Sequence, residues 1–221
     1  MSTNSLAFKG IIFDMDGTLI ASTQADYLAW KRTFADHGKE LTYESYFPLL
    51  GIKSADVIKK ELKLQGTEVD KALADKLFYF KEIVETKGID PIPYAEDLLK
   101  AVRKLAVKVA LATSSRRMKM QMVMEKLNFL QYFDEIVTGE EVHNSKPSPD
   151  IFLRAAEKLK LDPKECIVIE DAANGVTAAK KAGMMCIAIT TTHTKDQLSH
   201  ADLVIDTFKE VDFEKLCHII D

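Results

Sequence analysis

The amino-acid sequence predicts an α/β protein: a parallel β-sheet covered by helices and interrupted by one all-helical insertion. Two observations lead to this prediction. Short apolar, β-branched runs alternate with helical patterns over most of the chain, and a long stretch between the first two runs has helical spacing only. Strands that alternate with helices over short connections form right-handed βαβ units, which bury a parallel sheet between two helical layers.

The expected strands are short segments rich in Ile, Val and Ala. They are Gly10–Asp14, Val107–Ala112, Glu135–Val137, Cys166–Glu170, Met185–Ile189 and Leu203–Ile205. The helical patterns that alternate with them are Ala95–Leu105, Lys119–Leu127, Pro149–Leu159 and Gly175–Lys181.

The alternation is broken by the segment 22–87. Here "STQADYLAWKRTFADHG", "SADVIKKELKL" and "EVDKALADKLFYFKEIVETKG" all carry apolar residues at helical spacing. A connection between two parallel strands needs far fewer residues than this. The sequence therefore predicts a core formed by residues 1–21 and 88–221, with an α-helical subdomain at 22–87 inserted after the first strand.

The composition is that of a globular protein. The 221-residue chain is 47% hydrophobic and 29% charged, and its formal net charge of −4 gives no electrostatic case for a nucleic acid partner. No apolar run approaches the ~18 to 20 residues that cross a bilayer, and no basic start followed by an apolar block opens the chain. We therefore expect a cytoplasmic protein without a membrane partner. We also expect a monomer, because no long apolar stripe is left over, and small buried thiols at Cys166, Cys186 and Cys217.

Polar and reactive residues follow the predicted strands at the point where each strand ends. They are Asp14 and Asp16 after the first strand, Thr113, Ser114 and Ser115 after the second, Lys146 in "SKPSPD" after the third, and Glu170 and Asp171 at the end of the fourth. Ligands of open parallel sheets bind outside the carboxyl ends of the strands. The sequence therefore predicts one site on that edge of the sheet.

A cluster of carboxylates with a lysine and a hydroxyl suits phosphoryl transfer. Mg²⁺ binds through a few carboxylates plus substrate phosphate, which makes clustered carboxylates tolerable. One carboxylate can be the nucleophile that forms an aspartyl-phosphate. A second carboxylate two residues further along an extended backbone lies on the same side, where it can act as general acid and base. A lysine and a hydroxyl can hold the phosphoryl oxygens.

The motifs resemble those of a known family. "DMDGT", "TSS", "SKPSPD" and "IEDAANG", in this order along the core, resemble the four motifs of the haloacid dehalogenase superfamily. The helical insertion after the first motif resembles that superfamily's small cap domain. The resemblance implies a Rossmann-like parallel sheet core with an inserted α-helical cap domain. Within the superfamily, the chain is most similar to the β-phosphoglucomutase and sugar-phosphate phosphatase branch.

The resemblance also implies roles for individual residues. Asp14 would be the nucleophile and Asp16 the general acid and base. The phosphoryl group would be bound by Thr113, Lys146 and the backbone amide of Ser114. The implied Mg²⁺ ligands are Asp14, Asp16 through its backbone carbonyl, Asp171 and Glu170.

Purely structural roles are the alternatives for these residues. Asp14 and Asp16 could be turn residues before Gly17. Thr113, Ser114 and Ser115 could cap the following helix, as Asp171 could cap the helix that begins near Gly175. Lys146 could be a solvated surface lysine.

Substrate recognition is expected mainly from the insertion, because a core built for phosphate and metal is indifferent to the rest of the substrate. Trp30 and the loop around Gly51, which includes Lys53, resemble cap elements that face the core. Lys76 could reach a distal phosphate or hydroxyl, although its helical setting favours a solvated lysine. Arg116 could face the substrate from the rim or lie in solvent at a helix start.

Three positions depart from the pattern of the β-phosphoglucomutases. Ala21 stands where an aspartate is usual before the hydroxyl residue, Asp26 falls near the place of a histidine, and Ser54 beside Lys53 replaces a substrate-gripping arginine. These departures weaken the case for a mutase more than for a phosphatase, which needs only water to attack the intermediate.

The predicted function is a Mg²⁺-dependent phosphatase acting on a small phosphorylated metabolite, for which we expect a sugar phosphate. A phosphohexomutase is the alternative within enzymes. A non-catalytic phospho-ligand-binding module is the alternative outside them.

Overall fold

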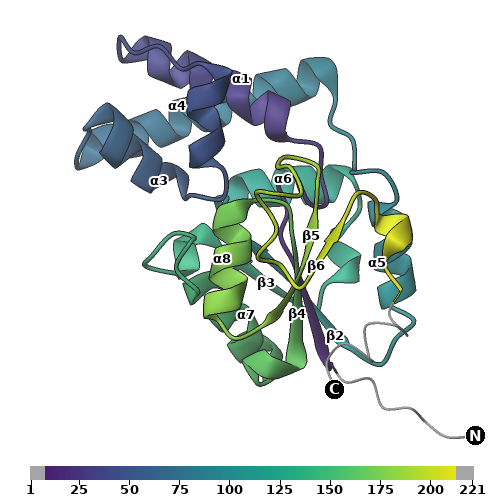
Figure 1. Cartoon of the computed structure of the whole chain (residues 1–221). Helices are drawn as coiled ribbons and strands as arrows, with labels where there is room; N and C mark the ends of the chain where they lie inside the picture. Colours follow the sequence, from purple (N-terminus) through teal and green to yellow (C-terminus); the bar gives the residue numbers. More distant parts are fainter. Residues whose placement is uncertain (1–7, 213–221) are drawn as a thin grey trace, which may run out of the picture.

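The structure is a computed structural model that describes residues 8–212 (Figure 1). Its sheet has six parallel strands in the order β3-β2-β1-β4-β5-β6. The strands are β1 (Gly10–Phe13), β2 (Lys108–Thr113), β3 (Glu135–Thr138), β4 (Cys166–Glu170), β5 (Met185–Ile189) and β6 (Leu203–Ile205). The predicted strands are confirmed to within a residue at each end, and the predicted fold class is confirmed with them.

Helices cover both faces of the sheet, as the alternation of strand side chains requires. Ile11 and Phe13 of β1 belong to one apolar cluster, whereas Ile12 between them belongs to another. The helices of the core are α5 (Ala95–Val102), α6 (Arg117–Lys126), α7 (Asp150–Leu159) and α8 (Ala173–Lys181). Side chains of α5 and α6 contribute to the first cluster and those of α7 and α8 to the second.

The segment 22–87, named here the cap segment, is helical and lies beyond the carboxyl ends of the strands (Figure 1). Its helices are α1 (Thr23–Asp36), α2 (Tyr43–Tyr46), α3 (Ser54–Val57) and α4 (Thr67–Lys87), with a 3-10 turn at Phe47–Leu49 and a π-helical turn at Ile58–Leu62. A third apolar cluster lies within it, including Trp30, Phe34, Tyr46 and Leu73. Its independence as a domain stays a prediction.

Two adjacent chain segments connect the cap segment to the core. The backbone N–H of Ala21 donates to the carbonyl of Asp90 over 2.9 Å, and that of Ile92 donates to the carbonyl of Leu19 over 2.9 Å. Gly88 ends α4 with a φ of 79°, a conformation that a β-carbon disfavours. The cap segment therefore leaves and re-enters the core at one place, directly after the loop that carries the two aspartates.

Cys166 and Cys186 are buried free thiols, as expected, and Cys217 lies outside the described residues. Among residues 8–212, no helix combines the length and apolar character needed to cross a membrane.

Candidate active site

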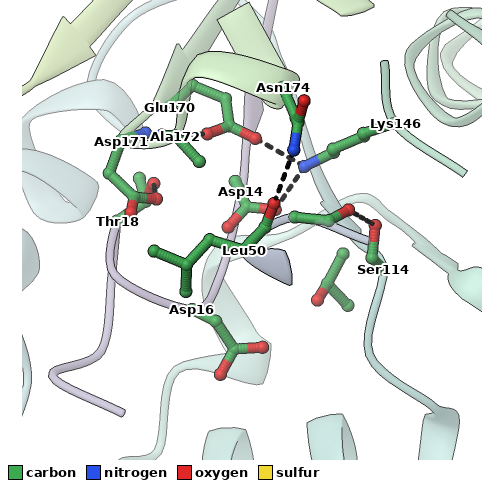
Figure 2. A network of polar contacts seen from close by, with 12 residues as sticks. Asp14, Asp16, Thr18, Leu50, Ser114, Lys146, Glu170, Asp171, Ala172 and Asn174 are labelled. Carbon is green, nitrogen blue, oxygen red and sulfur yellow. Dashed lines mark hydrogen bonds and ion pairs between the residues drawn. The ribbon is translucent and has the colours of Figure 1, made fainter. Parts of the chain in front are cut away.

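The predicted site residues of the core meet at the carboxyl ends of β1, β2 and β4; Figure 2 shows Asp14, Asp16, Ser114, Lys146, Glu170 and Asp171 among them. Asp14 follows β1 directly and is buried, with its backbone N–H donating to the carbonyl of Ile169 on β4 over 2.9 Å. The central position of β1 in the sheet thus places Asp14 between the ends of β2 and β4.

Lys146 reaches this cluster from the loop before α7. Its Nζ lies 2.6 Å from Oδ1 of Asp14 and 2.5 Å from Oε1 of Glu170, and its side chain is fully buried (Figure 2). Burial alone would lower the pKa of Lys146, but the charges of Asp14 and Glu170 raise it above the ordinary lysine value. The alternative of a solvated surface lysine is wrong.

If all were ionised, the three carboxylates of Asp14, Glu170 and Asp171 would carry more negative charge than Lys146 neutralises. Burial raises the pKa of Asp14 to about 7 against the opposing charge of Lys146. Burial also raises the pKa of Asp171 well above its usual range, and the nearby charges of Glu170 and Asp14 add to this rise. Such an environment favours a further positive charge or bound protons.

The residues fit a divalent metal ion. Ligand oxygens of Asp14, Glu170 and Asp171 lie within 4.8 Å of one another, and hard oxygens are the ligands that Mg²⁺ prefers. A β-carbon at Gly17 would collide with the carboxylate of Asp171, so this glycine leaves room beside a prospective ligand.

Asp171 and Glu170 are held differently. Asp171 accepts hydrogen bonds from Thr18 Oγ1 at 2.7 Å and Thr192 Oγ1 at 2.5 Å. The N-cap of α8 is Ala172, without a side-chain bond, so the alternative that Asp171 caps this helix is wrong. Glu170 accepts from Lys146 through one oxygen and from the backbone N–H groups of Asp171 and Ala172 through the other. Glu170 therefore orients Lys146 and the loop after β4.

Asp16 faces the pocket and is held by three side chains. Ser22 Oγ donates to Oδ1 over 2.5 Å, Ser115 Oγ to Oδ2 over 2.6 Å, and Lys119 Nζ to Oδ1 over 2.7 Å. Its side chain remains 26% exposed. A role as a turn residue alone does not account for a carboxylate with partners from three separate segments.

Thr113 and Ser114 line the same pocket at the end of β2. Oγ1 of Thr113 accepts from the backbone N–H of Ser115 over 3.1 Å, and Ser114 Oγ donates to the carbonyl of Gly51 over 2.6 Å. The N-cap of α6 is Arg116, and the carboxylate of Glu140 accepts from the backbone N–H of Arg117, so the capping alternative for residues 113–115 is wrong. The phosphate contact of the Ser114 amide stays a prediction.

The cap segment encloses a pocket of about 50 Å³ over these residues. Trp30 and Gly51 both line it, as the sequence predicts. The loop around Leu50 and Gly51, named here the cap loop, is fastened to the core on two sides. Asn174 Nδ2 donates to the carbonyl of Leu50 over 3.1 Å, and Ser114 Oγ donates to the carbonyl of Gly51 (Figure 2).

Lys76 and Lys53 differ from what their sequence settings favour, whereas Arg116 lies in solvent at the start of α6, one of its two expected settings. Lys76 is buried and lines the pocket, so the expectation of a solvated lysine is wrong. Its Nζ lies 2.8 Å from Oδ1 of Asp26. Lys53 points away from the pocket and donates to the carbonyls of Val142 and His143. Arg116 is outside the pocket lining and pairs with Glu140 in solvent.

Sequence reasoning missed Lys119 altogether and gave Asp26 no role. Lys119 is buried beside Asp16 and Asp26. A signal for it exists, because Lys119 shares the buried face of α6 with Met120 and Val123, and a charge on an apolar helix face needs a partner.

Comparison with known proteins agrees with this geometry. The sequence model of the haloacid dehalogenase-like hydrolase family matches residues 11–189, which include all four motifs. The chain belongs to this family. It is 30% identical over 205 residues to validoxylamine A 7'-phosphate phosphatase of Streptomyces hygroscopicus subsp. limoneus, covering 92% of this chain and 96% of that protein.

Two further relatives of this haloacid dehalogenase-like hydrolase cover nearly the whole chain. Hexitol phosphatase A of Escherichia coli (strain K12) is 32% identical over 207 residues, 94% of each protein. The crystal structure of β-phosphoglucomutase from Clostridium difficile matches with a TM-score of 0.87 at 26% identity, covering 96% of this chain and 97% of that one. The predicted family and fold are confirmed, as is the enzyme class, a haloacid dehalogenase-like phosphohydrolase.

Proposed function

We propose that the protein is a Mg²⁺-dependent phosphatase that hydrolyses a small sugar or polyol phosphate through an aspartyl-phosphate on Asp14. The observation that supports this best is the pairing of two carboxylates with different surroundings. Asp14 is buried and held by Lys146, whereas Asp16 faces the same pocket from two residues away. The named activities of the phosphatase relatives point to the same substrate class.

Asp14 is arranged to act as the nucleophile. Lys146 donates to its Oδ1, while no hydrogen bond from residues 8–212 reaches Oδ2. This second oxygen attacks phosphorus, and the bond from phosphorus to the leaving oxygen breaks as the Asp14–phosphorus bond forms. Asp16 donates a proton to the leaving oxygen, because its carboxyl group lies on the pocket side of the same loop.

Hydrolysis of the intermediate reverses the role of Asp16. Its carboxylate takes a proton from the water that attacks phosphorus, the bond to Asp14 breaks, and phosphate leaves. Mg²⁺ held by Asp14, Asp171 and the Asp16 carbonyl would supply charge neutralisation for the phosphoryl oxygens. Thr113, Ser114 and Lys146 position the transferring group in this proposal.

The charges in the pocket favour a phosphatase over a mutase. A mutase must bind a bisphosphate, whose second phosphate needs a free cation. Among the described residues, Lys76 is the one lysine or arginine in the pocket lining, and Asp26 neutralises it. The pocket therefore suits a monophosphate whose remaining atoms are uncharged.

A screen of phosphorylated metabolites tests the proposal, with phosphate release and isomer formation both measured in Mg²⁺. We expect phosphate release from sugar or polyol monophosphates. Asp14→Asn should lower this hydrolysis at least about a thousandfold, because the amide is a poor nucleophile. Asp97→Asn, at an exposed position of α5, is the control and should leave activity unchanged.

Two results would contradict the proposal. Retention of Mg²⁺-dependent hydrolysis by Asp14→Asn would exclude the aspartyl-phosphate. Isomerisation of a sugar phosphate primed with bisphosphate, without net phosphate release, would identify a mutase instead.

A further inference from the structure

Lys119 is a buried lysine next to the site that has no reacting role in the proposed function. Helix α6 turns Lys119, Met120 and Val123 inward, whereas Met118 beside them is exposed. The Lys119 residue is only 5% exposed. Its charge needs partners, because burying an unpaired ammonium group is strongly unfavourable.

Two carboxylates, one from each side of the boundary between core and cap segment, pair with Lys119. Its Nζ lies 2.7 Å from Oδ1 of Asp16 and 3.0 Å from Oδ1 of Asp26 on α1. The ring of Phe80 on α4 lies 4.5 Å away. Burial alone would lower the pKa of Lys119, but the two carboxylates raise it above the ordinary value, so the ammonium group stays charged.

Asp26 is in turn fixed within the cap segment. Nζ of Lys76 on α4 lies 2.8 Å from its Oδ1, and the hydroxyl of Tyr46 lies 3.4 Å from its Oδ2. Despite burial, the charges of Lys119 and Lys76 hold the pKa of Asp26 well below its usual range. The four charges of Lys76, Asp26, Lys119 and Asp16 therefore alternate in sign from α4 to the loop after β1.

This arrangement links the orientation of Asp16 to the position of the cap segment. Of the three side chains that bond Asp16, Lys119 is the one that also bonds a second carboxylate. Movement of the cap segment away from the core would separate Asp26 from Lys119. Water would then reach the ammonium group and compete with its bond to Asp16.

We propose that Lys119 is a positioning residue, which bridges Asp16 and Asp26 and so fixes the Asp16 carboxylate toward the pocket when the cap segment is closed. This inference rests on the proposed role of Asp16 as general acid and base. Lys119 itself lies outside the pocket lining and acts through Asp16.

Kinetics of charge-removing and charge-keeping variants test the bridge. With p-nitrophenyl phosphate and Mg²⁺, Lys119→Met should lower kcat about 100-fold, the scale of loss expected from a misplaced catalytic group, and change KM much less. Lys119→Arg keeps the charge and should recover kcat to within about tenfold of the wild type. Lys181→Met, at an exposed position of α8, should leave both constants unchanged.

Fluorescence of Trp30 gives a second readout that does not depend on activity. Trp30 is the single tryptophan of the chain, and Nζ of Lys76 lies 4.5 Å from its ring. Opening of the cap segment should raise quenching of Trp30 by acrylamide in Lys119→Met and in Asp26→Asn, but not in Asp14→Asn. The double variant Lys119→Met/Asp26→Asn should lose little more kcat than the worse single variant, because the two residues act as a unit.

Two outcomes would overturn the inference. A kcat for Lys119→Met within about threefold of the wild type would leave only a structural role. Equal acrylamide quenching of Trp30 in the wild type, Lys119→Met and Asp26→Asn would exclude the link to closure. If Lys119→Met does not fold, Lys119→Gln and Asp26→Asn decide between the same outcomes. Failure of the proposed function would instead show as absence of hydrolysis by the wild type. The acrylamide quenching of Trp30 would still test whether Lys119 and Asp26 hold the cap segment closed.

Discussion

At the scale of single residues, neighbouring side chains of one type have different tasks because their partners differ. Asp14, Asp16 and Asp26 lie close together in the sequence. Asp14 pairs with a buried lysine of the core, Asp16 faces the pocket with three donors around it, and Asp26 binds two lysines at the boundary with the cap segment. In the proposed mechanism, these partners therefore distinguish a nucleophile, an acid and base, and a charge-pairing residue.

Ser114 and Ser115 give a residue-scale prediction. Ser115 donates to Asp16, whereas Ser114 donates to the carbonyl of Gly51 in the cap loop. Ser115→Ala should lower kcat about tenfold with little change in KM, because Asp16 loses one of its fixed donors. Ser114→Ala should instead raise KM, because it loosens the contact of the cap loop. Steady-state kinetics on one substrate compare the two, and equal effects on kcat and KM would contradict the distinction.

At the scale of elements, α8 and β4 approach each other so closely that only a glycine fits between them. A β-carbon at Gly175, near the start of α8, would collide with the carboxylate of Glu170 at the end of β4. That carboxylate accepts from Lys146, which in turn binds Asp14. The close approach of α8 and β4 thus fixes the position of Glu170, which in turn holds Lys146 beside Asp14.

Substitution of this glycine is the element-scale prediction. In a helix, Gly→Ala ordinarily stabilises by about 0.5–1 kcal/mol. Gly175→Ala should have the opposite sign, with a loss of stability of about 1–3 kcal/mol from the clash and a large loss of activity from the displaced Glu170. Urea unfolding and steady-state kinetics measure the two effects.

Gly38→Ala serves as the control for this substitution. Gly38 has a positive φ and no neighbour within 4 Å of a β-carbon, so its replacement introduces backbone strain without a clash. It should lower stability by about 1 kcal/mol and leave activity unchanged. A Gly175→Ala variant that is fully active and more stable would contradict the role of the close approach.

At the scale of the whole molecule, we expect the buried acidic cluster to make stability depend on pH and on metal. Burial raises the pKa of Asp14 in the folded chain to about 7, whereas the pKa of an aspartate in an unfolded chain is about 3.9. Between these values the folded state keeps a proton that the unfolded state has lost. The free energy of unfolding of the metal-free protein therefore falls as pH rises through this window, and the contribution of Asp14 is lost above about pH 7.

Thermal unfolding in EDTA and in Mg²⁺ tests this dependence. Without metal, the Tm should be several degrees lower at about pH 7.5 than at about pH 5. Because Mg²⁺ binds ionised carboxylates, it should raise the Tm more at the higher pH. Asp171→Asn should abolish the Mg²⁺ effect. An Mg²⁺-induced rise in Tm that is equal at both pH values would contradict the coupling.

Much of the fold and of the catalytic edge was predictable from local patterns. The β-branched runs predicted the strands, and the polar residues after them predicted Asp14, Asp16, Lys146 and Asp171 as neighbours, because parallel strands end at one edge. Lys76 and Lys119 were not predictable in the same way. A lysine on a helix is ordinarily solvated, and only the packing of α4 and α6 against α1 and the core buries these two beside Asp26.

The sequence by itself determined the sheet, the insertion after the first strand and the set of reactive residues on one edge, because periodicity and strand ends are local properties of the chain. Only the tertiary structure decided which charges meet across the boundary of core and cap segment. Pairing of Lys119 with Asp16 and Asp26 depends on contacts between residues about 90 to 100 positions apart. Burial, which sets the strength of such pairs, is a property of the packed molecule.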